Sequence, residues 1–168
     1  MDIDETIHVP ADVATVWALL ADPRAVVECV EGASLGERLA DGSYEAKLTV
    51  RFGPAKVGFA ARVAIEIDEA ARSGTVSSRG KDGQGGTRFS SSTVYRVSAG
   101  DGGIGSAIRV QSKVEITGRL ASLIESGATL VIKRMTRDFS ERLAARCSAS
   151  PTGAPAAAAS PAAASPDD

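Results

Sequence analysis

Apolar and polar residues alternate along much of the chain up to residue 117, which predicts an antiparallel sheet with one buried face. Turns that contain glycine or proline separate the alternating blocks, as expected for strands joined by hairpins. The predicted strands cover residues 2–9, 44–52, 57–68, 74–81, 87–97 and 104–117, and residues 33–38 are expected to add an edge strand.

Two short stretches after the first strand follow a helical period instead. Asp12 precedes the first stretch and is placed to cap its N-terminus, and Pro23 interrupts the pattern before the second. The apolar positions of the first stretch recur at intervals of three and four residues, at Val13, Val16, Trp17 and Leu20. A second short turn of helix is expected around Val26 and Val27.

A change of period after Gly118 predicts one long amphipathic helix that runs to about Arg146. The fold class is therefore α+β, and a curved antiparallel sheet around the long helix is the simplest way to bury both apolar faces. These elements define one domain of residues 1–147. Residues 148–168 consist mainly of Ala, Pro and Ser, so they are expected to form a disordered tail or linker.

Composition and charge exclude several classes of protein. The formal net charge of the 168 residues is −2, so a nucleic-acid partner is not expected. Apolar stretches end well short of the ~20 residues of a membrane span, and the N-terminus is acidic, which predicts a cytoplasmic protein. Cys29 and Cys147 form no Cys-x-x-Cys pair, so both are expected to be reduced thiols without a metal or redox role.

No catalytic motif, metal site or cofactor site is predicted from the sequence. The single histidine, His8, lies on the predicted polar face of the first strand, where it is expected to be solvated. Glu5 is in phase with the apolar residues of the same strand. A carboxylate acting through water is the catalytic interpretation of Glu5, and a solvated strand end is the alternative.

Small residues at the inward positions of the later strands predict a cavity. The facing part of the long helix has Gly127 and Ala128 at its middle, so few bulky side chains are available to fill this part of the core. Gly127 is expected to lie across the cavity from Ser112. Apolar walls with a few hydroxyls suit a lipophilic ligand with one polar group. The alternative is that the small residues let helix and sheet approach closely around a filled core.

The predicted cavity residues come from the strands and from the apolar positions of the long helix. They are Phe52, Phe59, Val63, Val76, Ser78, Phe89, Ser91, Thr93, Tyr95, Val110, Ser112, Leu123, Gly127, Leu130, Val131 and Met135.

Basic residues outnumber acidic residues on the predicted long helix by six to three. Such a surface attracts anionic lipid headgroups. A solvated face with intrahelical ion pairs, such as Asp138 with Arg142, is the simpler interpretation.

Several local features follow one another in a distinctive order: Val16-Trp17, Asp22 followed by Cys29 and Gly32, the turn Gly53-Pro54, and Gly118-Arg119-Leu120-Ala121. Taken together, over residues 1–146, they resemble the family of the small G-type accessory chain of carbon monoxide dehydrogenase, a branch of the START-like, polyketide-cyclase-like superfamily. One departure is Glu31, where the family usually has proline before the glycine, and it affects the shape of that loop.

The resemblance implies a helix-grip fold with a lipid-sized cavity, no catalytic constellation, and service as an accessory protein to a molybdenum hydroxylase of the carbon monoxide dehydrogenase type. It also implies peripheral contact with the inner face of the cell membrane, because family members are associated with membrane recruitment of that enzyme. The expected ligand is a quinone or another isoprenoid or acyl lipid. A START-like cyclase or dehydratase, and an interaction module with a filled core, are the alternatives.

Overall fold

The computed structural model describes residues 1–149, so the predicted tail lies almost entirely outside the described residues. In chain order the elements are β1 (Asp2–Val9), α1 (Val13–Leu20), α2 (Pro23–Glu28), β2 (Ala33–Arg38), β3 (Tyr44–Phe52), β4 (Ala55–Asp68), β5 (Ser73–Asp82), β6 (Thr87–Ala99), the 3₁₀ turn η1 (Asp101–Gly103), β7 (Ser106–Gly118) and α3 (Ala121–Ala149). This order agrees with the predicted one.

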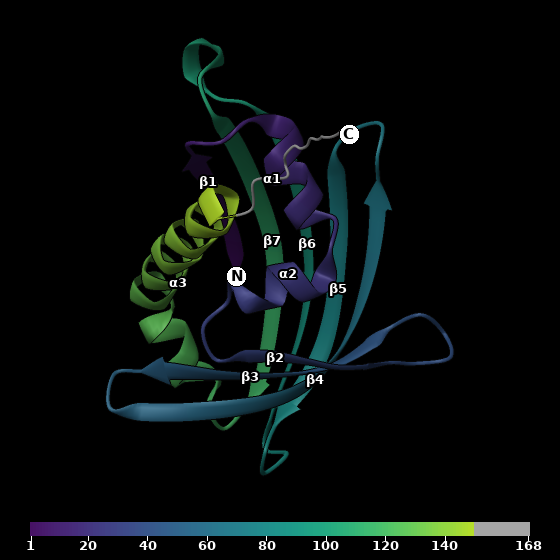
Figure 1. Cartoon of the computed structure of the whole chain (residues 1–168). Coiled ribbons are helices and arrows are strands. Elements are labelled where there is room, and N and C mark those ends of the chain that lie inside the picture. The colour runs from purple at the N-terminus through teal and green to yellow at the C-terminus, as the bar shows by residue number, and fades with distance from the viewer. Residues whose placement is uncertain (150–168) are drawn as a thin grey trace.

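The seven strands of the described residues form one antiparallel sheet in the order β1-β7-β6-β5-β4-β3-β2. Strand β4 has 14 residues and bends strongly, so that β2 and β3 cross the ends of β5, β6 and β7 (Figure 1). Helix α3 packs against β1, β3, β7 and α1 on the concave side of the sheet. This helix-grip architecture confirms the predicted fold class.

The first short helix begins at its predicted cap, Asp12, and the second begins at a cap that was not predicted, Asp22. The Asp12 carboxylate accepts a hydrogen bond from the Thr15 amide at 3.0 Å, and the Asp22 carboxylate accepts one from the Arg24 amide at 3.1 Å. Pro23 occupies the first turn of α2, where its missing N–H leaves no intrahelical bond unmade. Caps and proline together therefore set both helix starts locally.

The predicted start of the last strand at Ile104 is wrong, because β7 begins at Ser106. Gly103 and Gly105, on either side of Ile104, have φ angles of +76° and +67°, which curve the chain out of the extended conformation. The side chain of Ile104 is 82% exposed as a result. Apolar character alone does not place a residue in a strand when its neighbours adopt left-handed conformations.

The strand register confirms the predicted inward face. Residues directly opposite each other in an antiparallel pair project to the same face of the sheet. Thr93 lies opposite Val76 on β5 and Ser112 on β7, and Tyr95 lies opposite Val110. The alternation read from the sequence is therefore in phase across the sheet.

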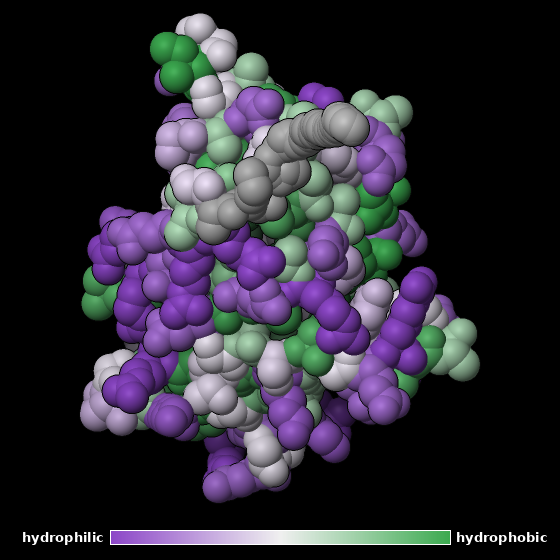
Figure 2. Space-filling view, in the orientation of Figure 1, coloured by the Kyte–Doolittle hydropathy of each residue, from purple (hydrophilic) through white to green (hydrophobic). Residues whose placement is uncertain are grey.

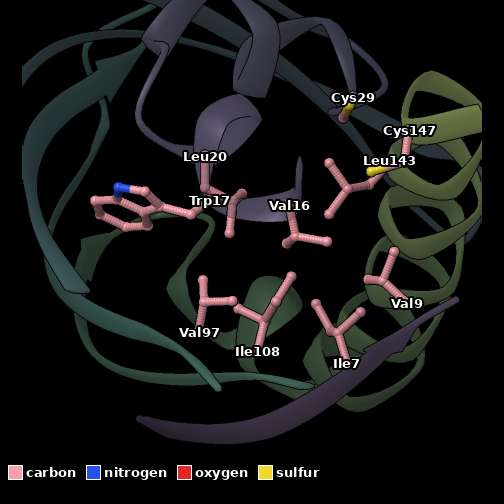
Figure 3. Close-up of a cluster of buried hydrophobic side chains, with 10 residues drawn as sticks. All are labelled: Ile7, Val9, Val16, Trp17, Leu20, Cys29, Val97, Ile108, Leu143 and Cys147. Carbon is pink, nitrogen blue, oxygen red and sulfur yellow. The ribbon is translucent and has the colours of Figure 1, made fainter. Parts of the chain in front are cut away.

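Two clusters of buried side chains fill the two ends of the space between the sheet and the helices. The first joins α1 to β1, β6, β7 and the last turns of α3, and Figure 3 shows its side chains converging: Ile7, Val9, Val16, Trp17, Leu20, Cys29, Val97, Ile108, Leu143 and Cys147. The second lies at the opposite end, between the β3–β4 hairpin and the first half of α3: Val50, Phe52, Val57, Phe59, Ile124 and Val131.

Candidate ligand-binding cavity

A cavity of about 300 Å³ lies between α2 and the strands of the concave face. Leu20 and Ile108 belong to the first cluster and also line the cavity, so that cluster forms one end wall. The full lining is Leu20, Pro23, Val26, Val27, Val30, Leu35, Ala46, Val63, Ile65, Val76, Thr93, Tyr95, Ile108, Val110 and Phe139. The volume is at the lower end of the range found for small-molecule sites.

The lining contains no charged side chain. Strand alternation accounts for the lack of charge at the centre of the sheet, since Arg62 on β4 and Arg79 on β5 lie opposite each other and project to the convex face. Inward residues at the centre of the sheet, including Val63, Val76 and Val110, are only half-buried, in contrast to the buried side chains of the two clusters. The cavity therefore favours uncharged, lipophilic molecules, because a buried charge without a partner is costly.

Two hydroxyl groups supply the polar side-chain atoms of the lining. The Tyr95 hydroxyl donates a hydrogen bond to the Leu20 carbonyl oxygen at 3.1 Å, and burial raises the pKa of its phenol. The Thr93 and Ser112 hydroxyl oxygens lie 2.7 Å apart across β6 and β7. Tyr95 is therefore engaged in holding α1 to the sheet, whereas Thr93 retains hydrogen-bonding capacity toward the cavity.

Five of the predicted cavity residues line this space together: Val63, Val76, Thr93, Tyr95 and Val110. They come from β4, β5, β6 and β7, and the strand register brings them together at the centre of the concave face.

Other predicted residues lie in or against the second buried cluster, outside the cavity lining. Phe59 and Phe89 pack edge to face there, with ring centroids 5.3 Å apart. Bulky aromatic rings fill this end of the molecule, whereas the sequence pattern predicted that the same rings line the cavity. The predicted residues found here are Phe52, Phe59, Phe89, Val131 and Met135.

Gly127 faces Phe52, and it does not line the cavity. A Cβ atom at Gly127 would lie 3.4 Å from the Phe52 ring, so the small residue lets α3 approach β3 closely at this point. Ser112 is half-buried and bonded to Thr93, but it too lies outside the lining. The structure thus does not bring Gly127 and Ser112 to opposite walls of one cavity.

The remaining predicted residues also lie outside the lining. Ser78 and Ser91 bond to each other across β5 and β6, with their hydroxyl oxygens 2.5 Å apart. Leu123 is 37% exposed and Leu130 is 76% exposed. These two leucines are seven residues apart on the outer face of α3, whereas the buried residues of the helix include Ile124 and Val131, each one position further along. A helical period read from sequence is easily displaced by one position when leucines occur beside the buried stripe.

The segment from α1 to β2 supplies lining residues that were not predicted, namely Leu20, Pro23, Val26, Val27, Val30 and Leu35. Val26 and Val27 were recognised as a helical turn, but the sequence does not say which surface that turn covers. Helix α2 contacts β2, and it covers the concave face beside that strand (Figure 1). The apolar pair Val26 and Val27 on a short helix was the feature of the sequence that could have identified this part of the lining.

The candidate catalytic residues that were considered from the sequence lie outside the cavity. Glu5 and His8 line a shallow groove between β1 and α3, together with Lys133 and Arg137, and neither belongs to the cavity lining. Residues 1–149 contain no group of three or more His, Cys, Asp or Glu side chains that could hold a metal ion. Within the same residues, no helix has both the length and the apolar character needed to cross a bilayer.

Comparison with protein families gives a match over residues 6–148 to CoxG, the family described as the G subunit of carbon monoxide dehydrogenase. Comparison with curated proteins gives no match.

Solved structures share the fold at low sequence identity. A conserved protein from Geobacillus kaustophilus superposes with a TM-score of 0.75 and 20% identity, over 89% of this chain and 97% of the other. The Zhui aromatase/cyclase from Streptomyces sp. R1128 gives 0.58 and 15%, over 89% and 94%. A START superfamily protein from Mycobacterium smegmatis gives 0.54 and 17%, over 88% and 97%. These likenesses establish a START-like fold.

Proposed function

Because the chain belongs to the CoxG family of carbon monoxide dehydrogenase, we propose that it is a non-catalytic accessory protein of a molybdenum hydroxylase of the carbon monoxide dehydrogenase type. In this role the cavity holds a lipophilic molecule, a quinone or another isoprenoid or acyl lipid. Membership of the family supports the proposed partner enzyme, and the cavity supports the proposed lipophilic ligand. The protein then acts at the inner face of the cell membrane, where lipid and enzyme meet.

The uncharged lining of the cavity is the observation that carries the ligand proposal. Burial of ~300 Å² of apolar ligand surface at ~25 cal/mol/Å² contributes ~7.5 kcal/mol before the costs of association. A quinone suits the cavity because its ring is uncharged and its carbonyl oxygen accepts a hydrogen bond from a hydroxyl such as that of Thr93. It also suits the partner, because electrons from a soluble dehydrogenase must reach a membrane pool.

Native mass spectrometry of the purified full chain, before and after organic extraction, tests the ligand proposal. We expect a lipophilic molecule in the extract, or micromolar binding when quinones, isoprenoids and fatty acids are titrated. A clean extract together with no binding in any titration would rule the proposal out.

A matched pair of variants locates the binding site. Ala46 lines the cavity from β3, whereas Ala64 is exposed on β4. Ala46→Leu is expected to keep the fold and to lose ligand, because the added side chain occupies cavity space. Ala64→Leu, the same substitution outside the cavity, is expected to bind normally. Equal binding by the two variants would place the ligand elsewhere.

Membership of the same superfold as an aromatase/cyclase raises one enzymatic alternative. A cyclase or dehydratase needs a polar pair deep in its pocket. The candidate groups are Glu5, which lines the groove beside α3, and Tyr95, whose hydroxyl donates to a backbone carbonyl. Incubation with the extracted ligand and with poly-β-ketone mimics, followed by mass analysis, distinguishes the two functions: a product of changed mass would favour the enzyme.

A further inference from the structure

The convex face of the sheet is not covered by the helices of the described residues. All three helices pack on the concave side, where α1 and α3 share the first buried cluster and α2 lines the cavity (Figure 1). Two shallow clefts, of about 620 and 510 Å³, lie over the middle of the convex face. Arg79, Ser90 and Glu115 line both clefts, so the two form one continuous surface.

Cations lie directly opposite each other on this surface. Arg62 on β4 is opposite Arg79 on β5, and Lys81 on β5 is opposite Arg88 on β6. Directly opposite residues of an antiparallel pair share a face, and their Cβ atoms are about 5 Å apart. Arg79 and Lys81 are two residues apart on one strand, so the two pairs adjoin. These four exposed cations therefore form a compact group, which we call the basic patch.

The basic patch costs the fold stability, because like charges directly opposite each other on a sheet repel. Among residues 1–149, no salt bridge joins any of its four cations to a carboxylate, so no ion pair offsets the repulsion. In another opposed pair on the convex face, Arg96 and Arg109, the Asp4 carboxylate lies 3.0 Å from Arg109 and relieves it. Two adjoining pairs without such relief favour a surface that binds an anionic partner.

Carboxylates border the basic patch on both sides. Glu45 on β3 lies opposite Arg62, and Glu115 on β7 lies opposite Ser90. Asp41 lines the larger of the two clefts. The surface thus has a positive centre and negative edges. Such a pattern discriminates between partners, because a matching surface needs carboxylates at its centre and a different charge at its rim.

Small side chains occupy the outward positions between the cations, namely Ala60, Ser77, Ser90 and Ser92. These positions offer no aromatic ring on which a nucleic-acid base could stack. They also offer no bulky apolar group for a lipid layer, and the negative edges oppose an anionic bilayer. Figure 2 shows the other, helix-bearing side, where hydrophobic and hydrophilic side chains are interspersed. An acidic protein surface is therefore the partner that the convex face fits best.

We propose that the convex face, centred on the basic patch, docks on an acidic surface of a partner protein. The inference rests on the proposed function in one respect, that this partner is the molybdenum hydroxylase. The four cations contact carboxylates of the partner, and the small side chains between them allow its side chains to approach the sheet closely. The cavity lies on the other side of the sheet, so docking leaves the ligand site free.

Binding of the full chain to the molybdenum hydroxylase purified from the same cells, measured by biolayer interferometry, tests this surface. The variant Arg79→Glu/Lys81→Glu is expected to bind at least ~10-fold more weakly, because like charges then meet across the interface. The same variant is expected to melt a few degrees higher than the wild type, because each new carboxylate faces a cation, Arg62 or Arg88. A purely structural role of the patch would not give weaker binding together with higher stability.

The matched control is Arg51→Glu/Lys56→Glu, which reverses another pair of opposed cations at the end of the β3–β4 hairpin. It is expected to bind the enzyme like the wild type. Equal weakening by the two double variants, or a lower melting temperature of the Arg79/Lys81 variant, would overturn the inference.

A polyglutamate peptide is a probe that does not depend on the identity of the enzyme. We expect it to bind the wild type and the control, to bind the Arg79/Lys81 variant weakly, and to compete with the enzyme. Binding of the peptide without binding of the enzyme would refute the proposed partner and leave the acidic docking surface standing, whereas binding of neither would refute the surface. Phosphatidylglycerol vesicles that the Arg79/Lys81 variant alone fails to bind, with no binding of the enzyme, would assign the patch to lipid and overturn the inference.

Ligand titrations separate the inference from the ligand proposal. The Arg79/Lys81 variant is expected to bind a short-chain quinone with the affinity of the wild type, because the substituted side chains project away from the cavity. A parallel loss of quinone and enzyme binding would show that the substitutions disturb the sheet as a whole, and would overturn the assignment of docking to the convex face.

Discussion

Thr93 and Ser112 face each other across β6 and β7, and their hydroxyl oxygens lie 2.7 Å apart on the concave face of the sheet. Thr93 lines the cavity, and Ser112 is half-buried beside it. Each hydroxyl can donate one hydrogen bond and accept others, so the pair can orient toward a ligand while it stays internally bonded. An otherwise apolar cavity thus has one adaptable polar point.

Thr93→Val tests this point because it preserves the side-chain shape and removes the hydroxyl. Ser112 loses its partner, so we expect a loss of about 1 kcal/mol in the free energy of unfolding. Affinity for a quinone should fall about fivefold, whereas affinity for a hydrocarbon of similar size should not fall. Titrations followed by the fluorescence of Trp17 measure the affinity for each of the two ligands. The Trp17 ring centroid lies 6.4 Å from that of Tyr95, a cavity residue. A similar loss for both ligands would show that the hydroxyl does not contact the ligand.

Gly127 is expected to respond in opposite ways to a small and a large substitution. Gly127→Ala should raise the free energy of unfolding by up to about 0.8–1.0 kcal/mol through helix propensity, since the new Cβ meets only the Phe52 ring at 3.4 Å. Gly127→Leu should overpack this contact and lower stability by about 1–3 kcal/mol. Urea denaturation compares the two. A leucine that stabilises the protein would show that this part of the helix faces a void.

Asp82 is expected to make the fold sensitive to acid. Burial raises the pKa of its carboxyl, but N–H donation from Gly86, Gln84 and Gly85 outweighs burial and brings the pKa below its ordinary value of 3.8. A carboxyl with a lowered pKa stabilises the fold above its unfolded-state pKa, and this contribution is lost as the pH falls through the folded-state pKa. The Asp82→Asn variant should therefore lose less stability than the wild type between pH ~5 and pH ~2 in urea titrations. Parallel curves for the two proteins would contradict this role.

Cys29 and Cys147 are expected to resist alkylation in the native protein. Both thiols are free and buried, with 1% and 9% of their surface exposed, and burial raises the pKa of each. Since the thiolate is the reactive form, modification by a chromogenic disulfide reagent at pH ~8 should be slow until the protein unfolds, and should then reach two equivalents. The Cys29→Ala variant serves as the one-equivalent control. Rapid reaction of the native wild type would show that the end of α3 opens from the first buried cluster.

Local features of the sequence were sufficient to predict the elements and the class of the fold. The period-two pattern identified the strands, Asp12 and Pro23 marked the short helices, and the change of period at Gly118 marked the long one. The inward face was also predicted, because alternation allows only two faces and the apolar one must be buried. The error at Ile104 arose where glycines with positive φ override the apolar pattern.

Tertiary structure alone decided where along the concave face the cavity lies. The sequence assigned Phe52, Phe59 and Val76 to one face, but it could not show that the two phenylalanines fill one end while Val76 lines the hollow middle. The bend of β4 and the position of α2 determine that division, and both depend on packing between segments far apart in the chain. The hydrogen bond from the Arg134 guanidinium to the Arg51 carbonyl oxygen likewise exists only because α3 meets the β3–β4 hairpin, since periodicity specifies the face on which a residue lies and not which residues of other elements pack against it.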